Sequence, residues 1–312
     1  MNFRRFLTLL VLLAALPAGG QTKFVFSPQW TAQAQFAGYY AAKELGFYSE
    51  EGLDVEIVHP FATQSLESRV KEGECQAYSM FLTEAMDFVD EGIPLVNILQ
   101  TSMNTSLMVV SRYGTDPSKL VNPKIVSWRA GFSLLARAVS AREGYNHDPV
   151  IASSVVNLFV AGAVDAALAT SYNEYFQLLQ TGLVKPDRDV FRFSDHGYNI
   201  QEDGVYMTLS EYRKNRDAAE RFARASRRGW EWVAEHPEEA LGIVMRYVKE
   251  YRVFTNETLQ RLMLEEILRL QLDPDSGQRE FRLREDMVRQ ASELMVDADL
   301  IGKEVTIEKL LP

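Results

Sequence analysis

The stretch SPQWTAQAQFAGYYAAKELGFYSEEGLDVEIVHP, residues 27–60, decides the fold. It follows a short apolar segment, TKFVF (22–26), and leads through a helical run, FAGYYAAKEL (36–45), to a second apolar segment after Gly52. A plain core helix needs neither the tryptophan nor the glutamines that crowd the start of this one. In open α/β folds, small molecules bind where a strand is followed by a helix. The stretch therefore predicts a strand–helix–strand unit with a binding site at the end of its first strand.

Short apolar segments alternate with helical stretches along the chain up to about residue 208. Such alternation is typical of βαβ units and mainly parallel sheets. The segments are residues 22–26, 54–60, 75–80, 94–100, 106–111, 124–128, 149–154, 165–170, 189–193 and 204–208. Long helices follow Ser210, with Pro237 near the start of one over 236–248 and a second over 256–272.

The sequence predicts an α/β protein of two lobes, each a mainly parallel sheet flanked by helices. Residues 21–106 form the first part of one lobe, and residues 107–206 form the other. Residues 207–312 complete the first lobe and add the C-terminal helices. Since no Pro- or Ser-rich linker interrupts the pattern, strands that cross between the lobes are expected to join them.

Residues 1–20 have the layout of a secretory signal peptide. Arg4 and Arg5 precede an apolar run over 6–16, and small residues follow through Gly20. The run is too short to span a bilayer as a helix, which disfavours the alternative of a retained membrane anchor. The spacing of Ala18 and Gly20 predicts cleavage before Gln21, although Leu16 and Ala18 offer another register, and a periplasmic location is expected. No cysteine lies at the cleavage site to carry a lipid.

Charge and cysteine content exclude several function classes. The chain has 33 Lys and Arg against 43 Asp and Glu, for a net charge of −10 at pH 7. Such a chain is not attracted to nucleic acid or to an anionic membrane. The one cysteine, Cys75, cannot form an internal disulfide, and the four histidines match no metal-ligand spacing. We expect no nucleic-acid partner, no cofactor and no metal.

Four segments in order carry a family resemblance: QWTAQAQFAGYYAAKELGFYSEEGLDV (29–55), GECQAYSMFLTEAMDFVDEGIPLVNI (73–98), SSVVNLFVAGAVDAALATSYNEY (153–175) and DHGYNIQEDGVYMT (195–208). Together they resemble the solute-binding proteins of ABC importers. The branch is the one similar to thiamine-pyrimidine synthases and to alkanesulfonate and taurine binders. The resemblance implies a two-lobed periplasmic-binding-protein fold of the type II kind, with the ligand in the inter-lobe cleft and hinge closure around it.

The opening stretch then gains a physical interpretation. Trp30 can present a flat face on which a heteroaromatic ring stacks, while Gln29, Thr31 and Gln33 can hydrogen-bond the edge of that ring. Phe36 stands where the resemblance places a histidine in pyrimidine-binding relatives. The alternative is that Trp30 packs beneath the helix as a core residue.

The segment SWRAGF (127–132) follows a strand and opens a helix. Its backbone N–H groups and helix dipole could receive an anionic or carbonyl group, with Arg129 adding charge and Gly131 allowing close approach. A turn with a solvated arginine is an equal alternative, because one glycine does not make a glycine-rich phosphate loop.

Two further segments follow predicted strands. In TSYNEY (170–175), Tyr172, Asn173 and Glu174 offer a ring, an amide and a carboxylate that suit an amino-pyrimidine, although helix capping explains the last two equally well. In NIQEDGVYM (199–207), Glu202 faces the cleft or fixes the hinge. For Asp203 an exposed turn is favoured.

The competing interpretation is an enzyme, because the resemblance extends to pyrimidine synthases. Their chemistry implies a lysine-bound pyridoxal phosphate, an active-site histidine and iron near a cysteine-rich motif. Alignment on Gly73 and GIP (92–94) places Met80 at the lysine position and Glu84 at the histidine position. A thioether cannot form a Schiff base, and residues 198–208 contain no cysteine. We therefore expect a binder and not an enzyme.

The predicted function is the periplasmic solute-binding component of an ABC importer, a monomer that delivers its ligand to the permease. The favoured ligand is an uncharged or weakly charged heteroaromatic compound such as a thiamine-precursor pyrimidine, with a riboflavin-like ring as runner-up. A ligand-binding sensor is a further alternative. The candidate ligand-binding residues are Gln29, Trp30, Thr31, Gln33, Phe36, Ser79, Trp128, Arg129, Gly131, Tyr172, Asn173, Glu174 and Glu202.

Overall fold

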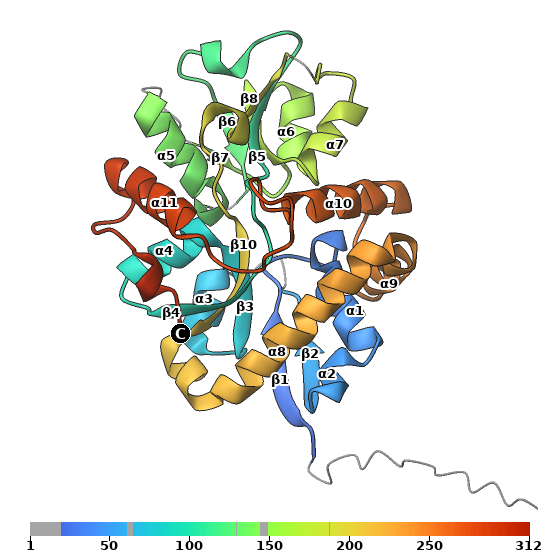
Figure 1. The fold of residues 1–312 in the computed structure, drawn as a ribbon. Coiled ribbons are helices and arrows are strands. Elements are labelled where there is room, and N and C mark those ends of the chain that lie inside the picture. Colours follow the sequence, from blue (N-terminus) through green and yellow to red (C-terminus); the bar gives the residue numbers. More distant parts are fainter. Residues whose placement is uncertain (1–19, 61–64, 129, 144–148, 187) are drawn as a thin grey trace, which may run out of the picture.

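The computed structural model describes residues 20–60, 65–128, 130–143, 149–186 and 188–312 (Figure 1). Residues 1–19 of the expected signal peptide lie outside this range. The described residues form two five-stranded sheets, and a strand lies within each of the ten predicted segments or overlaps it. The first sheet has the order β2 (Leu53–Ile57), β1 (Thr22–Ser27), β3 (Ala77–Phe81), β10 (Asp203–Thr208), β4 (Leu95–Gln100). The second has the order β7 (Val150–Ile151), β6 (Ile125–Ser127), β8 (Ala166–Thr170), β5 (Leu107–Ser111), β9 (Val190–Arg192).

Each sheet is mixed, with one strand opposed to the other four. In the first sheet β1 is parallel to β2 and β3, whereas β10 is antiparallel to β3 and β4. In the second sheet β6 is parallel to β7 and β8, whereas β5 is antiparallel to β8 and β9. Both opposed strands come directly after the chain crosses between the sheets. These two strands start at the segments that connect the sheets, whereas the other strands have their C-terminal ends near those segments.

The chain crosses between the sheets over residues 101–106 and again over 193–202. The returning strand β10 pairs with the first sheet from Asp203, opposite Phe81. Residues 203–206 therefore lie in the sheet of the first lobe, although the sequence placed them in the second. The apolar pattern marks a strand but does not identify its hydrogen-bonding partner, and β10 pairs with β3 and β4 of the first sheet.

Helices cover both sheets. One core packs the first sheet with α1 (Ala37–Glu44), α2 (Phe47–Glu50), α8 (Leu209–Glu235), α9 (Pro237–Glu250) and α10 (Glu257–Leu270). A second core includes α3 (Leu66–Glu72), α4 (Leu82–Asp90), α5 (Leu134–Glu143) and α11 (Glu285–Asp297). A third contains α6 (Val155–Ala161) and α7 (Glu174–Gln180). No helix in the described parts of the chain is long and apolar enough to cross a membrane.

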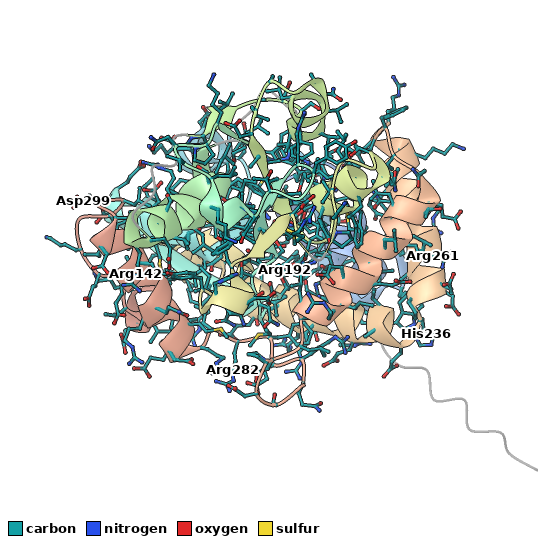
Figure 2. All side chains as sticks on the ribbon, turned by 90° about the horizontal axis from the view of Figure 1, so that it is seen from above. Arg142, Arg192, His236, Arg261, Arg282 and Asp299 are labelled. Atoms are coloured by element: carbon teal, nitrogen blue, oxygen red, sulfur yellow. The ribbon has the colours of Figure 1, made fainter. Side chains whose placement is uncertain are left out.

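The last long helix contacts both lobes. In Figure 1, α11 lies between α5 of the second lobe and α4 of the first, and it packs against both. Arg142 of α5 also pairs with Asp297 of α11 at 2.5 Å, and Figure 2 shows this arginine at the opposite edge of the molecule from Arg261 of α10. An exposed ion pair adds little stability. The apolar packing of α11 therefore makes the C-terminal segment part of the connection between the lobes, and not only of the first lobe.

Candidate functional site: the cleft between the lobes

A small cavity lies between the lobes at the ends of neighbouring parallel strands. In the first lobe its walls follow β1 and β3, which pair in parallel, and in the second they follow β6 and β8, which also pair in parallel. Open α/β sheets bind ligands at such strand ends. The first lobe contributes Gln29, Trp30, Gln33, Gln35, Phe81 and Glu84. The second lobe contributes Trp128, Phe132, Thr170, Tyr172, Asn173 and Glu174.

Two aromatic pairs cross the cleft. The ring centroids of Trp30 and Trp128 are 5.1 Å apart with their planes at 70°, and those of Phe81 and Phe132 are 5.7 Å apart at 35°. These contacts leave a free volume of only about 50 Å³. Pockets for organic ligands usually hold about 300–1,000 Å³. A heteroaromatic ring can therefore enter only if the paired rings or the lobes move apart.

Trp30 is anchored from behind by His59, a buried residue just after β2. The Nδ1 atom of His59 lies 2.6 Å from the carbonyl oxygen of Trp30, and its Nε2 atom lies 2.8 Å from the hydroxyl of Tyr40. Since a carbonyl oxygen only accepts, Nδ1 carries the hydrogen, and Nε2 accepts from Tyr40. Burial lowers the pKa of His59 to about 4, so the ring stays neutral at pH 7.

Trp128 is anchored through its side chain by Glu174. The indole Nε1 donates to Oε1 of Glu174 at 2.9 Å, and the Asn173 amide donates to the same oxygen at 3.1 Å. The other oxygen accepts from both the backbone N–H and the hydroxyl of Thr170. Four donors thus occupy this carboxylate. Its geometry fits a residue that orients Trp128 and the β8–α7 turn better than one that accepts from a ligand amine.

A chain of glutamines leads from the cavity to Asp203. Gln33 Nε2 donates to Gln35 Oε1 at 2.6 Å, and Gln35 Nε2 donates to Oδ2 of Asp203 at 2.7 Å. Gln29 Nε2 donates to Oδ1 of the same carboxylate at 2.6 Å. Burial raises the pKa of Asp203 to about 7, although both glutamines favour the charged form. The expectation of an exposed turn at Asp203 is wrong, because β10 starts there and points the carboxylate into the first lobe.

Several predicted site residues lie away from the cavity. Phe36 is buried in the core, with its ring 5.5 Å from His59, and Ser79 accepts a hydrogen bond from the Gln29 backbone at 2.9 Å beneath the cavity wall. Thr31 is partly exposed beside the cavity without lining it. Gly131 faces Glu84 across the cleft. Arg129 lies outside the described residues.

Glu202 belongs to the hinge. Its carboxylate accepts from the hydroxyl of Thr105, and from that of Ser106 at 2.7 Å, which ties the second crossing segment to the first. The side-chain oxygen of Asn199 accepts from the backbone N–H of Thr105 at 3.0 Å. Of the two roles considered for Glu202, the structure supports fixing the hinge, because both carboxylate oxygens are used there.

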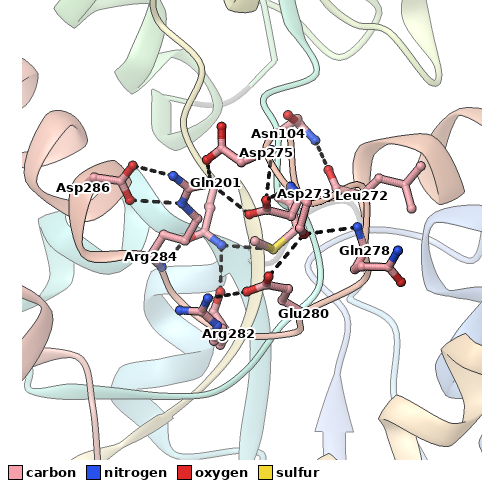
Figure 3. A network of polar contacts seen from close by, with 12 residues as sticks. Asn104, Gln201, Leu272, Asp273, Asp275, Gln278, Glu280, Arg282, Arg284 and Asp286 are labelled. Atoms are coloured by element: carbon pink, nitrogen blue, oxygen red, sulfur yellow. Dashed lines mark hydrogen bonds and ion pairs between the residues drawn. The ribbon is translucent and has the colours of Figure 1, made fainter.

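The loop between α10 and α11 closes over this hinge (Figure 3). Asn104 donates to the carbonyl of Leu272 at 2.7 Å, and Gln201 donates to the carbonyl of Arg282 at 2.8 Å. The backbone N–H of Arg284 donates to Gln201 at 2.7 Å, and the guanidinium of Arg284 pairs with Asp273, Asp275 and Asp286. Both crossing segments are therefore held by one polar loop.

Five residues that line the cavity are not among the predicted ligand contacts. Gln35, Phe81, Phe132 and Thr170 lie within or next to the segments already singled out, and Glu84 was considered only as the counterpart of a catalytic histidine. The end of β3 carried the same signal as the end of β1, since both strands lead into helices. Asp203 had no such signal, because it begins a strand instead of ending one.

Met80 lies in the core beside α4, fully buried, and not in the cavity. Glu84 lines the cavity from the first turn of α4. Within the described ranges, no group of three or more His, Cys, Asp or Glu side chains could hold a metal ion.

Two lobes, two crossing segments and a cleft at the strand ends define the periplasmic-binding-protein fold. The sequence model of the NMT1/THI5-like family matches residues 33–240, and the chain belongs to this family.

Comparison with known proteins agrees with this class. The chain is 22% identical over 227 residues to the formylaminopyrimidine-binding protein of Halalkalibacterium halodurans, which covers 69% of this chain and 68% of that protein. It has the fold of the ligand-binding component of an ABC-type import system from Staphylococcus aureus, with a TM-score of 0.70, 8% identity and coverage of 94% and 97%. The aliphatic sulphonate-binding protein SsuA from Escherichia coli gives a TM-score of 0.66, with 13% identity and coverage of 93% and 97%.

Proposed function

We propose that this chain is the solute-binding component of an ABC importer and takes a small heteroaromatic compound such as a thiamine-precursor pyrimidine. The observation that carries the proposal is the inter-lobe cavity, where Trp30 and Trp128 face each other from opposite lobes. Aromatic faces stack a flat ring, and the amides of Gln29, Gln33 and Asn173 can hydrogen-bond its edge. The name of the Halalkalibacterium relative supports a pyrimidine.

Export and delivery complete the proposal. The N-terminal basic, apolar and small-residue blocks support export to the periplasm, with cleavage near Gln21. The hinge and cleft support a cycle in which the lobes close around the ligand and a membrane permease recognises the closed form.

We further propose that the ligand leaves unchanged. Met80, at the position aligned with the catalytic lysine of pyrimidine synthases, is a buried core residue whose thioether cannot form a Schiff base. Incubation with pyridoxal phosphate and ferrous iron is expected to yield no pyrimidine product. Even a single-turnover product would overturn this part of the proposal.

Native mass spectrometry of gently purified protein tests the ligand class. We expect a bound heteroaromatic compound whose identity is then checked by calorimetry with hydroxymethylpyrimidine and with riboflavin. A co-purified aliphatic sulfonate, with no binding of either ring compound, would contradict the proposal. A Phe132→Ala variant, which removes one wall of the cavity, is expected to weaken ring binding without changing the fold.

A further inference from the structure

Asp203 controls the direction of the hydrogen bonds that reach the cavity. Each side-chain oxygen of Asp203 accepts from one amide, Oδ1 from Nε2 of Gln29 at 2.6 Å and Oδ2 from Nε2 of Gln35 at 2.7 Å, so both amides turn their NH₂ groups toward it. The oxygen of Gln35 then points away from Asp203. It accepts from Gln33 at 2.6 Å, which fixes the orientation of that amide as well.

The last amide in this chain lines the cavity. The side-chain nitrogen of Gln33 donates to Gln35, so the side-chain oxygen of Gln33 points away from Gln35. This oxygen accepts no hydrogen bond from any described residue. Gln33 and Gln35 are both buried, so neither amide is free to exchange its partners with bulk water. The wall therefore presents an acceptor at Gln33.

We propose that Asp203 is a positioning residue that sets ligand specificity, because it acts through Gln35 to present the amide oxygen of Gln33 to the ligand. The ligand class that this wall recognises carries an N–H donor, an exocyclic amine or a protonated ring nitrogen, on the edge that meets Gln33. A carbonyl oxygen at the same position faces another oxygen and is rejected. This inference rests on the proposed binding of a heteroaromatic ring.

Calorimetry with two probes tests the specificity. One probe is hydroxymethylpyrimidine with its exocyclic amine, and the other is the analogue that has a carbonyl oxygen in place of that amine. The wild type is expected to prefer the amine by about tenfold or more, since a site built for a donor rejects a ligand that lacks it. Asp203→Leu and Gln35→Leu each interrupt the series of hydrogen bonds from Asp203 through Gln35 to Gln33. Each is expected to lower the preference for the amine at least about fivefold.

Thr101→Val provides a matched control. The hydroxyl of Thr101 donates to the backbone carbonyl of Asp203 at 3.0 Å and does not touch its carboxylate. This variant is expected to keep the preference within about twofold of the wild type, because the chain of amides stays intact. An unchanged preference in folded Asp203→Leu and Gln35→Leu would overturn the inference.

A second measurement does not depend on any ligand. The side-chain amide signals of Gln33 can be assigned by NMR with a Gln33→Leu variant, and their hydrogen exchange can be followed. Exchange is expected to speed up at least about tenfold in Asp203→Leu but not in Thr101→Val, because Gln33 loses its fixed acceptor. If neither probe binds but exchange behaves as expected, the ligand class is wrong and the positioning role stands. Unchanged exchange overturns the positioning role itself.

Discussion

The two lobes meet at the cleft and at the hinge, and the two meeting places differ in chemistry. At the cleft, aromatic rings touch across the gap, with Trp30 and Trp128 5.1 Å apart. At the hinge, Glu202 binds two hydroxyls and Gln201 and Asn104 bind the loop over 271–284. An aromatic contact that opens leaves no hydrogen-bond donor or acceptor unpaired, whereas a buried hydrogen bond is costly to break. The chemistry of the two places therefore favours opening at the cleft and unbroken connections at the hinge.

Removing the hinge carboxylate is expected to have the largest effect. Glu202→Ala leaves the buried hydroxyls of Thr105 and Ser106 without their acceptor, which costs about 3 kcal/mol of unfolding free energy. Urea denaturation measures this loss. Ligand affinity of the folded variant at low temperature is expected to change much less. If affinity collapses while stability holds, Glu202 contacts the ligand and the division between hinge and cleft fails.

Asp203 lies where hinge and cleft meet, and its pKa predicts a pH dependence. Its folded pKa of about 7 exceeds its ordinary value of 3.8, so the folded state binds the proton more tightly. This contribution to stability is complete below pH 4 and is lost as pH rises through 7. The shift corresponds to at most about 4 kcal/mol, and the partial exposure of Asp203 reduces this to on the order of 2 kcal/mol.

Asp203→Asn is expected to flatten this slope. Unfolding curves between pH 4 and 8 give the comparison, and the slope matters more than the absolute stability, since asparagine also changes the hydrogen bonds to Gln29 and Gln35. Buried Glu202, whose pKa is also raised, leaves some dependence of the same sign. Identical slopes in the two proteins would show that the carboxylate of Asp203 is well solvated.

At the cleft, Trp30→Ala is expected to weaken binding at least about tenfold, because both stacking and apolar contact are lost. Stability is expected to fall less than affinity, since the ring is only partly buried against the first-lobe core. Calorimetry on folded protein, checked by circular dichroism, measures both. A lower melting temperature with unchanged affinity would make Trp30 a core residue and move the site elsewhere.

Gly131 tests how closely the lobes approach. A Cβ atom at this position would collide with the carboxylate of Glu84 on the other lobe. Gly131→Ala is therefore expected to hinder closure and weaken binding about threefold, on the order of 0.7 kcal/mol. Adding Glu84→Ala removes the collision and is expected to restore part of the ligand affinity that Gly131→Ala alone loses. In this double-mutant cycle, non-additive changes in binding free energy indicate that the two residues are in contact across the cleft. Simple additivity would mean that these residues do not meet in the closed form.

Much of the fold followed from local pattern. The ten apolar segments, the helix beginning at Pro237 and the helix over 257–270 were all predicted and are confirmed. The residues after β1, β6 and β8 were also named, because a strand followed by a helix marks a binding edge. Phe36, at the position where the resemblance implies a histidine, and Ser79 within β3 are also predicted site residues, yet they lie beneath the cavity wall, since position in sequence does not say which way a side chain points.

By itself, the sequence determined the order of strands and helices, the two-lobed class and the pair of tryptophan-bearing strand ends. Those features depend on periodicity and on turn residues that act over a few positions. Only the tertiary structure decided which strands pair, and hence that β10 returns at Asp203 and places a carboxylate beneath Gln29 and Gln35. It also decided that Glu174 is occupied by four donors and that α11 contacts both lobes. Each of these depends on residues far apart in the chain, and no local pattern records such distances.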